Sequence, residues 1–206
     1  RSIILIVFAT TNLYGKATPV EAKYGFERLS ESYEEAIGSN VIIYKHKATG
    51  GQVVYIQNED PNKVFALGFK TPIYDDTGVN HIIEHTVFTG SRKYDTKDVF
   101  FEMNKRSPNI YMNASTSVDM TVYPFSTRNH KDYENLLDVY LDAIFFPKLQ
   151  EEPYGFYQEG FHYHTDPDGN MNINGVVYNE MKGASVVPRR ILAMTNRPVM
   201  FPDTMY

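Results

Sequence analysis

The stretch that most constrains this chain is "GVNHIIEHTVFTG", residues 78–90, in which His81, Glu84 and His85 fall within five positions. Apolar residues, namely Ile82, Ile83, Val87 and Phe88, lie beside these three ionisable groups in the sequence. A solvated helix face needs no such apolar neighbours, and a core does not tolerate unpaired polar groups, because burying each one costs several kcal/mol. A metal ion bound by these side chains resolves the conflict.

The spacing of the two histidines suits one metal ion. On an α-helix, His81 and His85 project from the same face, one turn apart. Glu84 leans toward that face but is offset from the two ligands, so it reaches a metal-bound water without binding the metal. Zinc lowers the pKa of such a water from about 15.7 to about 7, and a carboxylate then takes its proton and delivers it to the leaving amine. The order H-x-x-E-H is the inverzincin signature.

The third ligand is not identified by spacing. Catalytic zinc sites generally use three protein ligands, and the chain contains no cysteine. The absence of cysteine also excludes disulfides, iron–sulfur clusters and cysteine nucleophiles. The downstream glutamates that remain open as third ligand are Glu134, Glu151, Glu152, Glu159 and Glu180. The alternative to a metal site is three polar side chains that stack on a solvated helix face.

Composition and periodicity indicate the fold class. The chain has 206 residues, 42% of them hydrophobic, which is enough for one domain with a substantial core. Its net charge is −5 and it has no basic block, so nucleic acid is not an expected partner. The pattern predicts strands at 41–47 and 52–57 joined by a turn, a strand at 63–70, and extended segments within 109–125. It predicts a turn at 166–170. Helices are predicted from about 79, over 96–107 with Thr96 as N-cap, over 130–146 and over 174–184. These elements favour an α+β fold, an antiparallel β-sheet flanked by helices.

The two ends suggest a piece of a longer protein. Residues 1–20 open with the apolar run 3–9, which fits either the remnant of a signal peptide or a first strand. The run is too short to span a bilayer, so stable membrane insertion is not expected. A signal peptide would imply a secreted or extracytoplasmic protein, and a strand an organelle matrix or the cytoplasm. Residues 24–206 are interpreted as one catalytic domain, truncated at its C-terminal end.

Several blocks resemble one family. "TGVNHIIEHTVFTGSRKY" resembles the zinc helix of the pitrilysin/insulinase metallopeptidases, and "YMNASTSVDMTVYPFSTRNHKDYENLLDVYLDAIFFPKL", "QEGFHYH" and "GVVYNEMKGA" are similar, in the same order, to blocks of its presequence-protease and falcilysin branch. The resemblance covers about residues 24–206. It implies the N-terminal domain of the pitrilysin/processing-peptidase type metallohydrolase fold. It also implies one Zn²⁺ bound by His81, His85 and Glu180 of "NEMKG", with Glu84 as general base.

The same resemblance assigns a substrate-binding segment. In the family, an N-A-x-T segment forms an edge strand beside the zinc, and the substrate joins it as an added strand. The matching residues here are Asn113, Ala114, Ser115 and Thr116; taken alone, these residues would indicate an ordinary strand with an asparagine in a bulge. Glu159 of "QEG" is interpreted as supporting the ligands or as structural, and no role is expected for His162 and His164.

The predicted function is that of a zinc-dependent endopeptidase that degrades unstructured peptides. The alternative is a catalytically inactive family subunit that binds peptides or has a structural role, although the chain keeps His81, Glu84, His85 and Glu180. S-ribosylhomocysteine lyases share H-x-x-E-H but need a cysteine ligand, which is absent. The resemblance also implies a C-terminal half that supplies an arginine and a tyrosine to the reaction. Without that half, the chain is expected to be weakly active or inactive.

Overall fold

A computed structural model describes residues 4–11, 24–202 and 204, and the chain divides into two compact units. The sheet unit comprises Arg1–Thr71, Phe101–Ser115 and Met120–Tyr140. The histidine unit comprises Pro72–Phe100, Thr116–Asp119 and Leu141–Tyr206, and it contains the H-x-x-E-H stretch.

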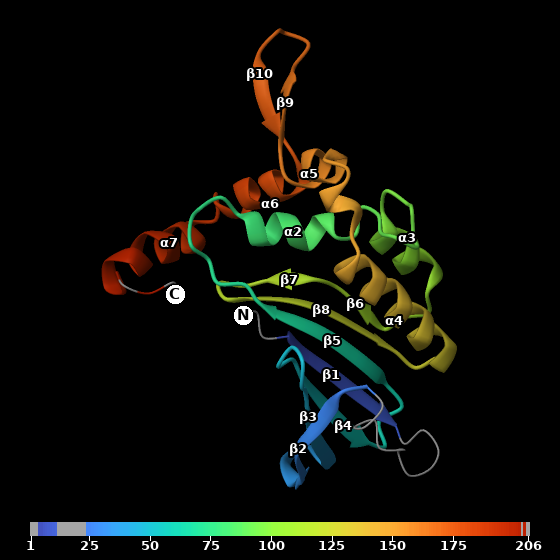
Figure 1. Cartoon of the computed structure of the whole chain (residues 1–206). Helices are drawn as coiled ribbons and strands as arrows, with labels where there is room; N and C mark the ends of the chain where they lie inside the picture. The colour runs from blue at the N-terminus through green and yellow to red at the C-terminus, as the bar shows by residue number, and fades with distance from the viewer. Residues whose placement is uncertain (1–3, 12–23, 203, 205–206) are drawn as a thin grey trace. The chain divides into compact units, whose positions relative to one another are not determined.

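The sheet unit is built on strands in the order β2-β3-β4-β1-β5-β8-β6, with β7 paired to β8 (Figure 1). The strands are β1 (Ile4–Thr11), β2 (Phe26–Glu34), β3 (Ser39–His46), β4 (Gln52–Asn58), β5 (Lys63–Lys70), β6 (Tyr111–Met112), β7 (Ser115–Thr116) and β8 (Met120–Thr127). The predicted hairpin is confirmed as β3 and β4, and the strand at 63–70 as β5. The pairing of β1 with β4 is parallel and that with β5 antiparallel, because β1 lies between two strands of opposite direction.

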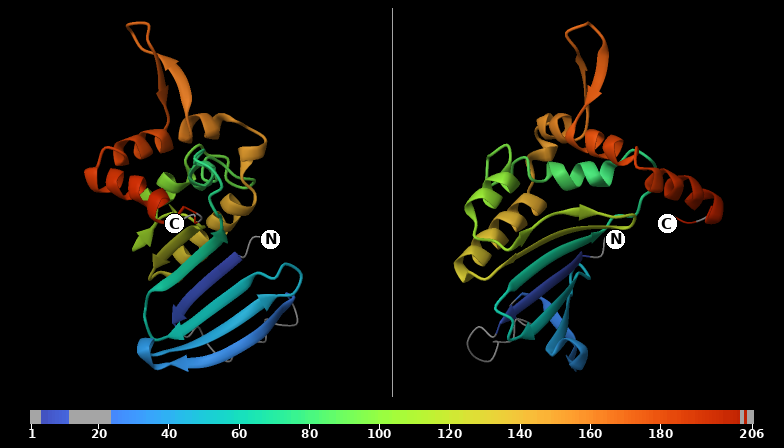
Figure 2. Two further views of the ribbon diagram at one scale, coloured as in Figure 1. Left: turned by 90° about the vertical axis from the view of Figure 1, so that its left-hand side faces the viewer. Right: turned by 180° about the vertical axis from the view of Figure 1, so that it is seen from behind.

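One amphipathic helix covers the core of this sheet. α4 (His130–Phe145) confirms the helix predicted before Pro147, and up to Tyr140 it belongs to the sheet unit. The ring centroid of Phe125 on β8 lies 5.3 Å from the ring centroid of Phe65 on β5. It lies 5.4 Å from the ring centroid of Tyr133 and 5.1 Å from that of Tyr140, both on α4. Figure 2 shows this part of α4 across the face of β5 and β8. Together with the predominantly antiparallel sheet, this confirms the predicted α+β class.

One helix start differs from the prediction, and two elements were not predicted. α3 (Val99–Arg106) begins three residues later than expected, so Thr96 is not at its N-cap position. The Val99 N–H donates to the Phe88 carbonyl at 3.0 Å, and residues 97–98 form a turn before the helix. The strand β2 and the 3₁₀ turn η1 (Glu35–Ile37) were not predicted, because β2 is mostly polar and exposed and shows no apolar alternation.

The histidine unit is mainly helical. It contains α2 (Val79–Thr86), η2 (Lys148–Gln150), α5 (Tyr154–Glu159), β9 (His162–Thr165), β10 (Met171–Asn174), α6 (Val176–Ala184) and α7 (Pro188–Met200). The helices α2, α5 and α6 pack against one another. The predicted helices near 79 and over 174–184 are confirmed as α2 and α6, and the turn at 166–170 joins β9 to β10. Within the part of the chain that the structure describes, no helix is both long and apolar enough to cross a membrane.

A buried carboxylate holds the loop that follows α2. Asp142 is 3% exposed, accepts the Lys93 backbone N–H at 2.8 Å and lies 3.3 Å from an Arg92 guanidinium nitrogen. Burial raises the pKa of Asp142, but these bonds, one from Ser91 and the nearby positive charges outweigh it, so the pKa lies below its ordinary value. The ionised carboxylate therefore stabilises the folded unit.

Replacing Asp142 by alanine should lower the free energy of unfolding by about 1–3 kcal/mol at neutral pH, because the hydrogen bond from the Lys93 N–H to this charged, buried acceptor is lost. Since the folded pKa lies below the unfolded one, the contribution of Asp142 is present above the unfolded pKa of about 3.9 and is lost as the pH falls through the folded pKa. Urea unfolding at several pH values measures both effects. Asp95→Asn is the control, because Asp95 is 81% exposed in its ion pair with Lys148 and should contribute less than Asp142. Equal losses in the two variants would contradict this account.

Candidate metal centre

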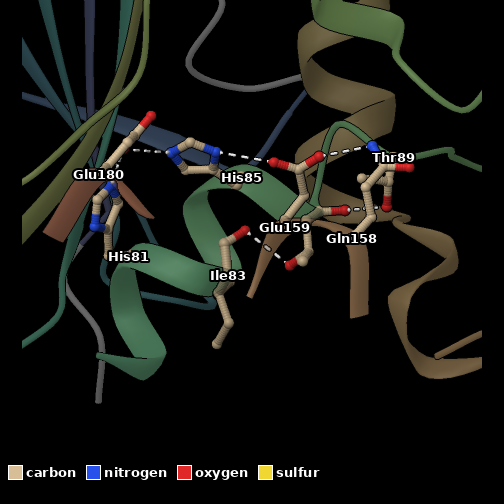
Figure 3. A network of polar contacts seen from close by, with 8 residues as sticks. His81, Ile83, His85, Thr89, Gln158, Glu159 and Glu180 are labelled. Carbon is tan, nitrogen blue, oxygen red and sulfur yellow. Dashed lines mark hydrogen bonds and ion pairs between the residues drawn. The ribbon is translucent and has the colours of Figure 1, made fainter. Parts of the chain in front are cut away.

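The two histidines of α2 face a glutamate of α6. Nε2 of His81 lies 3.5 Å from Oε2 of Glu180, and Nε2 of His85 lies 3.7 Å from the same oxygen. The centroids of the two imidazole rings are 5.0 Å apart, and the rings are drawn in Figure 3. Three potential ligand atoms from two helices therefore converge on one point, and the i, i+4 spacing within α2 supplies two of them.

These distances suit a divalent metal ion. Bonds of about 2.0–2.2 Å at tetrahedral angles place zinc ligand atoms about 3.3–3.5 Å from one another. The separations of 3.5 and 3.7 Å are close to that range without any rearrangement of the helices. Two imidazoles and one carboxylate are also a donor set found in catalytic zinc sites. The Oε2 atom of Glu180 belongs to a half-exposed side chain, so the point of convergence is accessible.

Glu84 lies beside this point and belongs to the same cluster of potential ligands as His81 and His85. Its ligand atom is within 4.8 Å of those of His81 and His85. Glu84 is 5% exposed, and its Oε2 has no hydrogen-bond partner among the described residues. A buried carboxylate oxygen without a donor is costly, so this atom is expected to meet a donor that arrives from outside the chain. A water molecule or a peptide N–H supplies such a donor.

Glu159 of α5 contacts His85 at Nδ1, the ring nitrogen that does not face Glu180. Its Oε2 accepts a hydrogen bond from Nδ1 of His85 at 3.1 Å, and Gln158 donates to its Oε1 at 2.8 Å (Figure 3). An ionised carboxylate only accepts, so Nδ1 carries the proton, and Nε2 of the neutral ring keeps the lone pair that a metal needs. Glu159 therefore lies where a residue that orients a ligand is expected, on the side of the ring away from Glu180.

The charges of the site act on both partners of this bond. The hydrogen bond with Glu159 raises the pKa of His85, burial opposes it, and the charges of Glu180, Glu159 and Glu84 add to the rise. Burial raises the pKa of Glu159, but the hydrogen bonds from His85 and Gln158 and the charge of His85 outweigh it, so the pKa falls below its ordinary value. Three carboxylates around two imidazoles give the site a negative charge, which favours a bound cation.

The other glutamates considered as third ligand lie elsewhere. Glu134 belongs to the sheet unit and pairs with Lys131 at 3.2 Å and His130 at 3.5 Å. Glu151 and Glu152 are exposed residues that follow η2. His162 lies on β9, with Nδ1 2.7 Å from the Tyr157 carbonyl oxygen, and His164 lies on the same strand. Sequence reasoning missed Gln158; its only signal was its place before Glu159 in "QEG".

The predicted substrate-binding segment lies at one end of the sheet order. β6 is the last strand of that order, and Asn113 and Ala114 follow it directly. The Asn113 backbone N–H donates to the Pro124 carbonyl, and its side-chain oxygen accepts from the Ala114 N–H at 2.9 Å. Asn113 and Ser115 are exposed, and Ala114 and Thr116 half-buried. Asn113 to Ser115 belong to the sheet unit and Thr116 to the histidine unit, so substrate binding by this segment stays a prediction.

Comparisons with known proteins agree on one family. Residues 74–154 match the model of the insulinase family, peptidase family M16. The chain is 46% identical over 89% of its length to presequence protease 1, chloroplastic/mitochondrial, of Arabidopsis thaliana, of which it covers 17%. It is 44% identical over 88% of its length to protein HypA of Clostridium perfringens, of which it covers 19%. It is also 46% identical over 78% of its length to the mitochondrial presequence protease of Mus musculus, of which it covers 16%.

A solved structure supports the fold. The crystal structure of pitrilysin matches 61% of this chain and 14% of that chain, with a TM-score of 0.52 and 21% identity. The chain spans less than a fifth of the length of the three curated relatives from Arabidopsis thaliana, Clostridium perfringens and Mus musculus.

Proposed function

The chain belongs to the insulinase family, peptidase family M16, and on this premise we propose that it is the metal-carrying, N-terminal part of a zinc-dependent endopeptidase that degrades unstructured peptides. The observation that supports the proposal best is the approach of Glu180 Oε2 to within 3.5 and 3.7 Å of the two histidine Nε2 atoms. His81, His85 and Glu180 would hold one Zn²⁺. Bound there, zinc would leave a fourth position open to water, lower the pKa of that water toward about 7 and polarise the scissile carbonyl.

The residues of this chain account for the movement of the proton. The unpartnered oxygen of Glu84 accepts a proton from the attacking water as the water oxygen bonds to the carbonyl carbon. Glu84 then delivers that proton to the amine nitrogen as the carbon–nitrogen bond breaks, which balances the hydrolysis. Glu159 keeps His85 in the orientation and tautomer that direct Nε2 toward Glu180.

Substrate selection is assigned to the edge segment Asn113–Thr116. A peptide that adds a strand to a sheet edge binds mainly through its backbone, so many sequences are acceptable but the peptide must be extended. A family enzyme whose second half encloses the peptide adds a limit on size. We expect cleavage of unstructured peptides of about 10 to 70 residues, since longer chains usually fold into domains.

The test uses the enzyme at its full length, because the chain covers only 17% of a relative such as the Arabidopsis protease. One peptide is offered free and then embedded in a stable folded host, and cleavage is followed by mass spectrometry with zinc present and after chelation. We expect zinc-dependent cleavage of the free peptide and survival of the embedded one. Equal cleavage in both contexts would contradict the edge-strand account. Bound zinc without any cleavage would instead indicate an inactive relative.

A further inference from the structure

Between the two glutamates of the site, a largely exposed hairpin lies in the sequence. β9 and β10 connect α5, which carries Glu159, to α6, which carries Glu180. Figures 1 and 2 show this hairpin extending away from α5 and α6 within the histidine unit. Among the described residues, its strands pair with each other alone, and Tyr163 and Met171 on it are 65% and 74% exposed. The exposed part of the hairpin, residues 163–173, is therefore not expected to place Glu180, although it precedes Glu180 in the chain.

The two ends of the hairpin meet at a close contact between glycines. A Cβ built on Gly175 would overlap the carbonyl oxygen of Gly160 and lie 2.7 Å from the Gly160 carbonyl carbon and from the Phe161 Cα. These neighbours are backbone atoms, which do not move aside as a side chain does. Gly175 also has φ +156°, a value that L-residues rarely adopt. Gly175 is thus required both by its conformation and by its neighbours.

Gly160 also lies close to α2, the helix that carries the two histidines. A Cβ built on Gly160 would lie 2.8 Å from the Phe156 carbonyl oxygen of α5 and 3.1 Å from the Ile82 Cγ2 of α2. Ile82 lies between the two histidines in sequence and is 8% exposed. Three elements therefore converge on Gly160: α2 through Ile82, α5 through Phe156, and the start of α6 through Gly175.

Hydrogen bonds attach α6 to this point. The Tyr178 N–H of the first turn of α6 is directed at the Gly160 carbonyl oxygen at 3.4 Å. Asn174 accepts the Gly175 N–H at 2.9 Å and a side-chain N–H of Asn179 at 2.7 Å. Asn179 directly precedes Glu180, so a displacement of this turn is passed to the Glu180 carboxylate.

We infer that Gly160 and Gly175 are positioning residues that set the distance between Glu180 and the histidine pair, and that the hairpin is dispensable for metal binding. The inference rests on the proposed zinc site. Added methyl groups at the junction push α6 away from α2. The gap between Oε2 of Glu180 and the Nε2 atoms then exceeds what one metal spans, while the sheet unit keeps its own core.

The experiment compares zinc affinity and coordination in the full-length protein. Zinc affinity is measured by competition with a chromophoric chelator, and Co²⁺ replaces zinc as a probe whose absorption in the visible range distinguishes four-coordinate from higher-coordinate sites. Gly175→Ala should lower zinc affinity by at least about 10-fold, as for residues that position ligands, and weaken the four-coordinate Co²⁺ spectrum. A merely structural role would lower the melting temperature and leave the spectrum unchanged.

Further variants make the result decisive. Gly169, at the hairpin turn, also has a positive φ (+85°) but no atom within 4 Å of an added Cβ, so Gly169→Ala should cost some stability and leave zinc affinity unchanged. Replacement of residues 163–173 by a short glycine linker should keep zinc affinity within about 3-fold, well inside the 10- to 100-fold cost of disturbing a ligand's support. If Gly175→Ala fails to fold, Gly160→Ala, whose Cβ would lie 3.1 Å from the Ile82 Cγ2, tests the same junction, and unchanged zinc affinity in it would overturn the positioning role. Loss of zinc in a folded deletion variant would overturn the statement that the hairpin is dispensable.

The outcomes separate this inference from the proposed function. If the unmodified protein binds no zinc, or His81→Ala binds it equally well, the zinc site itself is wrong. If the unmodified protein binds zinc through His81 and Gly175→Ala binds it with unchanged affinity and spectrum, only the positioning role of the junction is wrong.

Discussion

Replacing Glu84 by glutamine should lower turnover by at least about 10²-fold while zinc stays bound, since general-base catalysis contributes at least that much. Glutamine keeps the shape of the side chain but does not accept the proton of the attacking water. Glu84 is 5% exposed and its Oε2 has no partner among the described residues, so this oxygen is not required by another contact there. The stability of the fold should therefore change little.

The measurement is steady-state hydrolysis of an unstructured peptide by the full-length enzyme, with zinc content determined on the same samples. Glu151→Gln is the matched control, because Glu151 is an exposed glutamate after η2 and should leave both quantities unchanged. Near-normal turnover in Glu84→Gln would remove its role as general base. Loss of zinc from that variant would make Glu84 a ligand instead.

The parts of the fold that were predictable are those with a local apolar pattern. The pattern of α4 places Tyr133, Leu136 and Tyr140 on one face, and all three are buried. The strands β3, β4 and β5 are rich in β-branched and aromatic residues and were predicted nearly to their ends. In α4 and β5, residues that determine the local conformation are also buried, such as Phe65 and Leu67 of β5.

The elements that were missed lack that signal. β2 is exposed along most of its length, so its residues are polar and do not alternate. α5 is six residues long and contains a glycine, which makes it too short for helical periodicity to show. α7 carries a proline inside the helix and has no buried residue among those described, so no apolar stripe facing a core marks it.

The candidate site divides in the same way. His81 and His85 were paired from the sequence because their relation is contained in one helical turn. The relation of Glu180 to them depends on how α6 packs, through Gly160 and Gly175, and no spacing rule encodes it. Reasoning from the residues therefore left five glutamates open, and only the resemblance of "NEMKG" to the family selected Glu180.

The same substitution, glutamate to glutamine, should have a much larger effect on zinc binding at Glu180 than at Glu159. Glu180→Gln should lose more zinc affinity than the about 10- to 100-fold typical of residues behind the ligands, because it removes a charged ligand whose oxygen faces both Nε2 atoms. Glu159→Gln should keep zinc at saturating concentration, since the glutamine oxygen still accepts the Nδ1–H of His85. The loss of the negative charge at Glu159 should lower zinc affinity by no more than about 10- to 100-fold.

Thermal unfolding with and without added zinc gives an independent measure. An ion that binds only the folded state stabilises it by RT ln(1 + c/Kd), where c is the concentration of the free ion, so at one zinc concentration tighter binding gives a larger rise in melting temperature. The zinc-dependent rise should be nearly absent in Glu180→Gln and reduced but present in Glu159→Gln. The reverse result would exchange the two roles: α5 would supply the third ligand, and the 3.1 Å contact of Glu159 with His85 would have to open for a metal to enter. The two carboxylates lie on opposite sides of one imidazole, so the experiment decides which ring nitrogen faces the metal.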